Sequence, residues 1–132
     1  MSIGKILVAV DGSNPSFNAS KYAIDLAKRY DAELIVLNIV SPVPYSHFEY
    51  ANIGRMKEIE TIEKEKAQQK LDKVKQKATE KEVSVKTDVL IKYTSVVKEI
   101  VEYAENMKID MIVIGSRGVT GFKKLLLGSV TS

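Results

Sequence analysis

The chain contains 132 residues, of which 45% are hydrophobic and 28% are charged, and its formal net charge at pH 7 is +3. This length is typical of one domain with a substantial core, and the weak basic excess, interleaved with glutamates, gives no support for nucleic-acid binding. The chain has no cysteine, which excludes disulfides, thiolate chemistry and cysteine-based metal sites, and no apolar run near the ~20 residues that span a bilayer.

Four short apolar runs, rich in β-branched residues, predict β-strands at residues 5–10, 33–40, 83–91 and 110–115. The first, second and fourth are nearly continuous in apolar residues, as expected for parallel strands that are covered on both faces. The third alternates between apolar and polar residues, which favours a position nearer the edge of the sheet.

Helical spacing of apolar residues fills the intervals between these runs. One helix is predicted to begin at Asn14 and Pro15 and to end at Tyr30, because proline suits the first helical turn. A second should span residues 56–80 with lysine and glutamate on a solvated face, and a third should begin with Thr94 or Ser95 as its cap. The apolar positions at helical spacing are Ala19, Tyr22, Ala23, Leu26, Ala27 and Tyr30 in the first helix, Ile59, Ile62, Ala67, Leu71, Val74 and Ala78 in the second, and Val97, Ile100, Val101 and Ala104 in the third.

The predicted elements alternate as β-α-β-α-β-α-β and lead into a glycine-containing segment, residues 115–132. Such alternation predicts an α/β fold in which an open, doubly wound parallel sheet lies between two layers of helices. Residues 1–132 are expected to form a single domain. The loop over residues 41–54 is unusually long, and loops of this length are more often functional than simple connectors.

The carboxyl ends of the strands are the expected ligand-binding edge, because open parallel sheets bind ligands where the strand order reverses. The first strand leads into residues 11–13, the second brings Ile39 to this edge, and the fourth leads into Gly115. An acid, an apolar edge and a glycine-rich turn together favour a nucleotide pocket. Neither the GxxxxGK[ST] pattern nor a GxGxxG pattern after the first strand occurs in the sequence.

Each candidate residue also has a purely structural explanation. Asp11 could bind a ribose hydroxyl or cap the turn before the first helix, and Ser13 is better explained as a helix cap. Gly115 and Gly118 could contact a nucleotide or only turn the chain after a strand. Arg117 is a candidate phosphate partner, although exposed basic residues are usually solvated.

The sequence resembles the universal stress protein family over all 132 residues. The resemblance rests on KILVAVDGS at the start, the long loop after the second strand, DMIVIGSRG after the third helix and LLLGSVTS at the end. The spacing G-x2-G-x9-G-[ST] is similar to the signature of the ATP-binding members. The resemblance implies the strand order 3-2-1-4-5, with ATP lying across the first and fourth strands.

The same resemblance implies a role for each matching position. Asp11 would accept hydrogen bonds from the ribose hydroxyls, the backbone at Ile39 would meet the adenine, and Ile114 would line the pocket. Backbone N–H groups and the hydroxyl of one serine would surround the ribose and the phosphates. The residues in this last role are Gly115, Gly118, Gly128, Ser129 and Val130.

Family members continue past GSVT into a final helix and a fifth strand, whereas this sequence stops at Ser132. We therefore expect the fifth strand to be missing from this sequence and the natural protein to extend beyond it. Without that helix, the phosphate-binding backbone would lack the helix dipole that favours anions.

The function implied is that of a cytoplasmic, ATP-binding stress-response protein, a homodimer in which nucleotide occupancy changes dimer or partner contacts. Mg²⁺ or Mn²⁺ accompanying the ATP would be held mainly by the phosphates. The sequence shows no nucleophile–base pair, carboxylate pair or metal-ligand cluster, so at most a weak ATPase is expected. Two alternatives stay open: a dimeric interaction protein that needs no nucleotide, and a weak metal-dependent ATPase. Neither nucleic acid nor a membrane is expected as a partner.

Overall fold

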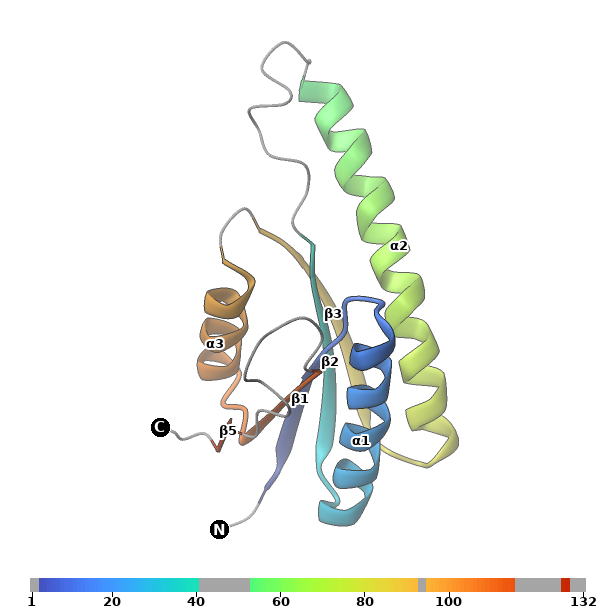
Figure 1. Ribbon diagram of the computed structural model, residues 1–132, viewed down its shortest axis with the longest axis vertical. Coiled ribbons are helices and arrows are strands. Elements are labelled where there is room, and N and C mark those ends of the chain that lie inside the picture. Colours follow the sequence, from blue (N-terminus) through green and yellow to red (C-terminus); the bar gives the residue numbers. More distant parts are fainter. Residues whose placement is uncertain (1–2, 41–52, 93–94, 116–126, 129–132) are drawn as a thin grey trace.

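The computed structural model of the protein describes residues 3–40, 53–92, 95–115 and 127–128. Over these ranges the chain forms one sheet with the strand order β3-β2-β1-β4-β5 (Figure 1). Neighbouring strands pair in parallel among the first four, which are β1 (Lys5–Ala9), β2 (Glu33–Val40), β3 (Val85–Ile91) and β4 (Met111–Ile114). The predicted α/β class and the parallel order 3-2-1-4 are therefore confirmed.

The helices that follow the first three strands are α1 (Asn14–Tyr30), α2 (Ile53–Glu80) and α3 (Val96–Asn106). α1 and α2 lie on one face of the sheet and α3 lies on the other, which gives the predicted three layers (Figure 1). The Ser95 hydroxyl caps α3 by accepting a hydrogen bond from the Lys98 N–H at 3.4 Å, so one of the two predicted caps is confirmed. None of the described helices combines the length and the apolar composition needed to cross a membrane.

A short fifth strand, β5 (Leu127–Gly128), lies beside β4 and runs antiparallel to it. Its register places Leu127 opposite Ile112 and Gly128 opposite Met111. The sequence predicts no strand after β4 within these residues, so this pairing differs from the prediction. A parallel fifth strand would need a crossover of about a dozen residues or more, whereas an antiparallel partner needs only a turn of the chain.

The core consists of two apolar layers, one on each face of the sheet. Ile6 and Val8 face α1 and α2, and Leu7 between them faces α3. All three are fully buried, because β1 has a strand on either side and helices over both faces. The helix residues that complete the two layers are Ala19, Ala23, Ile24 and Ala27 of α1, Ala67, Leu71, Val74 and Ala78 of α2, and Ile100 and Ala104 of α3.

Several apolar helix positions identified from their spacing are exposed in the structure. Tyr22 and Tyr30 of α1 are 41% and 45% exposed, Ile62 of α2 is 50% exposed, and Val97 and Val101 of α3 are 64% and 40% exposed. A helix that rests on a sheet buries the stripe along its line of contact, and residues beside this stripe stay accessible. The spacing therefore predicted the helices correctly, but the buried stripe of each helix is narrower than the spacing suggested.

The first turn of α1 lies against the end of β4. A Cβ atom at Gly115 would lie 2.7 Å from the carbonyl oxygen of Pro15 and 3.0 Å from the backbone nitrogen of Ser16. Backbone atoms cannot swing aside as a long side chain can, so a larger residue would push the helix away from the strand. Gly115 therefore has a packing role that does not depend on any ligand.

One side-chain hydrogen bond ties α3 to the edge strand β3. The Tyr103 hydroxyl donates to Asp88 Oδ2 at 3.0 Å. Burial of the phenol raises the pKa of Tyr103 to about 12, and the hydrogen bond to Asp88 and its negative charge act in the same direction.

We predict that Tyr103 makes the stability of the wild type depend on pH in alkaline solution. The folded-state pKa of about 12 lies above the ordinary value of 10.0, so the stabilising contribution is complete below pH 10 and is lost as the pH rises through 12. Denaturant unfolding across this range should show a steeper loss of stability for the wild type than for Tyr103→Phe. Equal slopes for the two proteins would contradict the prediction.

Gly115→Ala should lower the free energy of unfolding by about 1–3 kcal/mol, the usual cost of overpacking a closely packed contact. Gly4→Ala is a matched control, because a Cβ atom there would lie 3.5 Å from Asp110 Oδ2, which is an ordinary contact. Urea denaturation measures both effects. Equally small effects for the two variants would show that α1 and β4 can separate at little cost.

Candidate functional site

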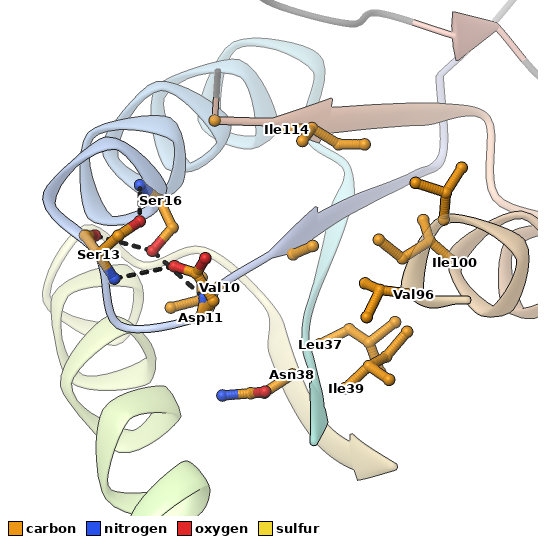
Figure 2. A pocket seen from close by; sticks show the side chains of 13 residues that line it. Val10, Asp11, Ser13, Ser16, Leu37, Asn38, Ile39, Val96, Ile100 and Ile114 are labelled. Carbon is orange, nitrogen blue, oxygen red and sulfur yellow. Dashed lines mark hydrogen bonds between the residues drawn. The ribbon is translucent and has the colours of Figure 1, made fainter. Parts of the chain in front are cut away.

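A cavity of about 270 Å³ lies at the carboxyl ends of β1, β2 and β4, beside the start of α3 (Figure 2). The strand order reverses at β1, since β2 and β3 lie on one side of it and β4 lies on the other. Open parallel sheets bind ligands at such a point. The volume is slightly below the range of roughly 300–1,000 Å³ that is typical of small-molecule sites. The cavity therefore lies at the edge of the sheet where the sequence predicted a site.

The end of β2 projects beyond the end of β1. Pairing between the two strands ends with Ala9 opposite Leu37 and a 2.8 Å hydrogen bond from the Val10 N–H to the Leu37 carbonyl, whereas β2 continues to Val40. The Val40 carbonyl accepts from Lys92, so its backbone groups point toward β3. Because successive residues of a strand direct these groups to alternate sides, the N–H and C=O of Ile39 point toward β1, beyond the last paired residue.

Apolar side chains form one side of the cavity. Leu37 and Ile39 come from β2 and Ile114 from β4, and all three belong to the apolar layer that α3 covers. α3 contributes Ile100, which is 5% exposed, and the valines at the start of the helix. Such a wall is suited to apolar contact with a flat aromatic ring. The apolar residues that line the cavity are Ala9, Val10, Leu37, Ile39, Val96, Val97, Ile100 and Ile114.

The turn from β1 into α1 forms the polar side of the cavity (Figure 2). The Asp11 carboxylate accepts a hydrogen bond from the Ser13 N–H at 2.8 Å. The Ser13 hydroxyl accepts from the Ser16 N–H at 3.2 Å and caps α1, as predicted. The Ser16 hydroxyl donates to the Ser13 carbonyl at 2.8 Å and accepts from the Asp11 N–H at 3.3 Å. Asp11 therefore stabilises the turn through its carboxylate. The same hydrogen bond holds this carboxylate at the cavity.

Gly12 connects this turn to α2. Its φ of +93° lies in the region that favours glycine, and a Cβ atom there would lie 2.9 Å from both Cδ and Cε of Lys70. Lys70 belongs to the charged face of α2, which the sequence analysis expected to be solvated. Its side chain instead reaches the residue next to Asp11 and adds a positive charge to this region. No local pattern could have shown this contact, because it joins residues far apart in the sequence.

The structure brings four of the predicted site residues together at the cavity: Asp11, Ile39, Ile114 and Gly115. It also adds residues that the sequence analysis did not select. Among these, Asn38 is polar yet only 5% exposed. The sequence feature that could have identified Asn38 is its position as a polar residue within the apolar run of 33–40.

Gly128 does not lie at the cavity. It is opposite Met111, the first residue of β4, whereas the cavity lies beyond the last residue of that strand. The remaining predicted site residues lie outside the described residues, and their binding roles stay predictions: Arg117, Gly118, Ser129 and Val130. Within the described ranges, no three His, Cys, Asp or Glu side chains are grouped so that they could hold a metal ion.

The chain is similar in sequence to known proteins over nearly its whole length. It is 40% identical over 126 residues to a universal stress protein of Methanocaldococcus jannaschii, covering 96% of this chain and 72% of that protein. It is 34% identical over 132 residues to a universal stress protein of Bacillus subtilis, covering 96% of this chain and 88% of that protein.

Solved structures share its fold. The protein MJ0577 aligns with a TM-score of 0.72 and 26% identity over 98% of this chain and 85% of its own. The universal stress protein of Archaeoglobus fulgidus in complex with dAMP aligns with a TM-score of 0.63 and 22% identity, over 86% and 82% of the two chains. A universal stress protein family protein of Arabidopsis thaliana with AMP bound aligns with a TM-score of 0.64 and 18% identity, over 89% and 80%.

Residues 2–132 match the universal stress protein family as a whole. This match spans the four parallel strands and the cavity at their carboxyl ends. From the sequence match, its two relatives and the shared fold, we conclude that the chain belongs to the universal stress protein family.

Proposed function

We propose that this protein binds an adenine nucleotide in the cavity at the ends of β1, β2 and β4. The observation that carries the proposal is that one cavity combines a carboxylate held by its own turn, that of Asp11, with a wall of apolar side chains. The similar proteins solved with dAMP and AMP support the choice of an adenine nucleotide.

The end of β2 suits the base. Its apolar side chains Leu37 and Ile39 can contact the faces of a purine ring. The N–H and C=O of Ile39 extend past the pairing with β1 and offer one donor and one acceptor. Adenine presents an acceptor, N1, beside a donor, the N6 amino group, so the two edges are complementary.

The end of β1 suits the ribose. An ionised carboxylate forms strong hydrogen bonds with hydroxyl donors, and the Asp11 carboxylate lines the same cavity as the end of β2. A carboxylate can accept several hydrogen bonds, so the bond from the Ser13 N–H is compatible with bonds from the 2′- and 3′-hydroxyls. The structural and binding explanations of Asp11 are therefore not exclusive.

We further propose that the nucleotide is ATP, whose phosphates meet the glycine segment after β4. The support is the spacing G-x2-G-x9-G-[ST] from Gly115 to Ser129 and the general ability of glycine-rich turns to bring N–H groups to phosphates. The position of Gly128 opposite Met111 gives no support to its part in this site. Mg²⁺ or Mn²⁺ bound with the nucleotide would be held mainly by its phosphates.

Asp11→Asn should weaken adenine nucleotide binding about 10- to 100-fold, which corresponds to the loss of roughly 1.5–3 kcal/mol from hydrogen bonds to a charged group. Asparagine keeps an oxygen that can accept from the Ser13 N–H, so the turn is retained. The measurement is isothermal titration calorimetry with ATP, ADP and AMP, after native mass spectrometry has verified that the protein carries no nucleotide from purification.

Asp31→Asn is the matched control for this measurement. It removes the same charge at the carboxyl end of α1, and asparagine tolerates the left-handed backbone found there, with φ of 53°. Affinity should be unchanged in this variant. Unchanged affinity in Asp11→Asn would show that Asp11 only shapes its turn, and no binding of ATP, ADP or AMP to the wild type would refute the proposed function.

We also propose that nucleotide occupancy alters the contacts of a cytoplasmic homodimer in a stress response. The support for this part is the family to which the chain belongs. Sedimentation velocity at a fixed protein concentration should give different monomer–dimer distributions with and without saturating ATP. Identical distributions would remove this regulatory role and leave nucleotide binding in place.

A further inference from the structure

We propose that Val96, in the first turn of α3, covers one face of the adenine ring, and that the ring lies nearly parallel to the sheet, beyond the end of β1. The proposal rests on the proposed function, because it assigns the orientation of the base and a further binding residue within the same cavity. It adds an apolar contact from a helix to the hydrogen bonds from the backbone of Ile39.

The backbone of Ile39 fixes the orientation of the ring. Its N–H and C=O point toward β1, beyond the last paired residue, Ala9. Both groups lie close to the plane of the sheet, since neighbouring strands form their hydrogen bonds within that plane. Adenine N1 and the N6 amino group lie in the plane of the ring. A base bound through both atoms therefore lies nearly parallel to the sheet, and its two faces are directed toward the two helical layers.

The first turn of α3 lies on one side of this ring. α3 follows β3 and begins near the carboxyl ends of the strands, so its first residue, Val96, lines the cavity. Figure 2 shows Val96 projecting from α3 toward the end of β2, where Leu37 and Ile39 lie. Leu37 and Ile39 belong to the apolar layer that α3 covers. Their side chains and Val96 therefore border the same face of the ring.

Val96 is exposed although it continues the buried stripe of α3. Ile100 and Ala104 follow it at intervals of four residues, so the three lie along one side of the helix. Ile100 and Ala104 are 5% and 8% exposed, whereas Val96 is 42% exposed. The stripe therefore extends past the covered part of the sheet and into the cavity. An aromatic ring bound there would give Val96 the apolar contact that the sheet gives to Ile100 and Ala104.

Two other exposed valines of α3 differ from Val96. Val97 is 64% exposed and also lines the cavity, but it lies about 100° around the helix from Val96 and so outside the stripe. Val101 is 40% exposed and is not among the residues that line the cavity. Only Val96 combines exposure with a place in both the buried stripe and the cavity wall.

Contact with the ring would remove the exposed part of the Val96 side chain from water. Burial of apolar surface is favourable roughly in proportion to its area, and methyl groups gain dispersion energy where they lie against the ring. This contact does not recognise the polar edge of the base. It holds the ring parallel to the sheet, so that N1 and N6 stay aligned with the Ile39 backbone.

Nuclear magnetic resonance of the wild-type protein with AMP tests this orientation. Protons above the face of an aromatic ring are shielded by its ring current, whereas protons near its edge are deshielded. The methyl signals of Val96 should therefore move upfield when AMP saturates the protein, and those of Val101 should stay in place. Val96 signals that stay in place or move downfield would overturn the proposal.

The affinity of Val96→Ala gives a second test. Calorimetry should show that this variant binds AMP about 2- to 5-fold more weakly than the wild type, because it lacks two methyl groups that are only partly buried before binding. Val101→Ala is the matched control, since it makes the same change at similar exposure on the same helix, away from the cavity. Its affinity should equal that of the wild type, and equal affinities for the two variants would contradict the proposal.

The outcomes separate this proposal from the one on which it rests. ATP replaces AMP in both measurements if AMP does not saturate the protein. If the wild type binds nucleotide but the Val96 signals do not move upfield, the inference is wrong and the proposed function stands. If Val96→Ala does not fold, the signals of the wild type decide. If the wild type binds neither AMP nor ATP, the proposed function itself fails.

Discussion

The cavity depends on a difference in length between two neighbouring strands. The pairing between β1 and β2 ends at Ala9, whereas β2 continues to Val40 and there pairs only with β3. The backbone groups on the β1 side of Ile39 then face a space that no paired strand fills. β1 is also where the strand order reverses, and open parallel sheets bind ligands at such a point.

The same geometry explains why the two sides of the cavity differ chemically. A sheet covered on both faces has an apolar layer on each side, and the layer beneath α3 extends to the end of β2 through Leu37 and Ile39. The turn into α1 must satisfy its own backbone groups, and it does so with the side chains of Asp11, Ser13 and Ser16. An apolar wall and a polar turn therefore meet at the switch point for structural reasons. A ligand with an aromatic ring and a hydroxylated sugar fits this combination.

The glycines near the site have two separable roles. Gly12 combines a left-handed backbone with the close approach of Lys70, and Gly115 allows the backbone of Pro15 and Ser16 to lie against the end of β4. These requirements hold whether or not a nucleotide is bound. The phosphate-binding role of the glycine pattern is a further proposal, and the antiparallel pairing of Gly128 with β4 separates that residue from the cavity.

The sequence by itself determined the four parallel strands, the three helices and the edge of the sheet at which the site lies. Apolar periodicity predicted the parallel strands and the sheet-facing stripe from Ala67 to Ala78. Local cap chemistry predicted Ser13, and it predicted Ser95 with Thr94 as the alternative. Asp11, Ile39, Ile114 and Gly115 could be predicted together because parallel strands bring their carboxyl ends to one edge. Only the tertiary structure decided that Tyr22 and Val97 lie outside the buried stripes and that β5 runs antiparallel. It also decided that Lys70 reaches Gly12, that Gly115 touches the first turn of α1, and that Asn38 lines the cavity. Each of these features depends on how segments that are far apart in the sequence pack in space. The local spacing of residues does not encode that packing.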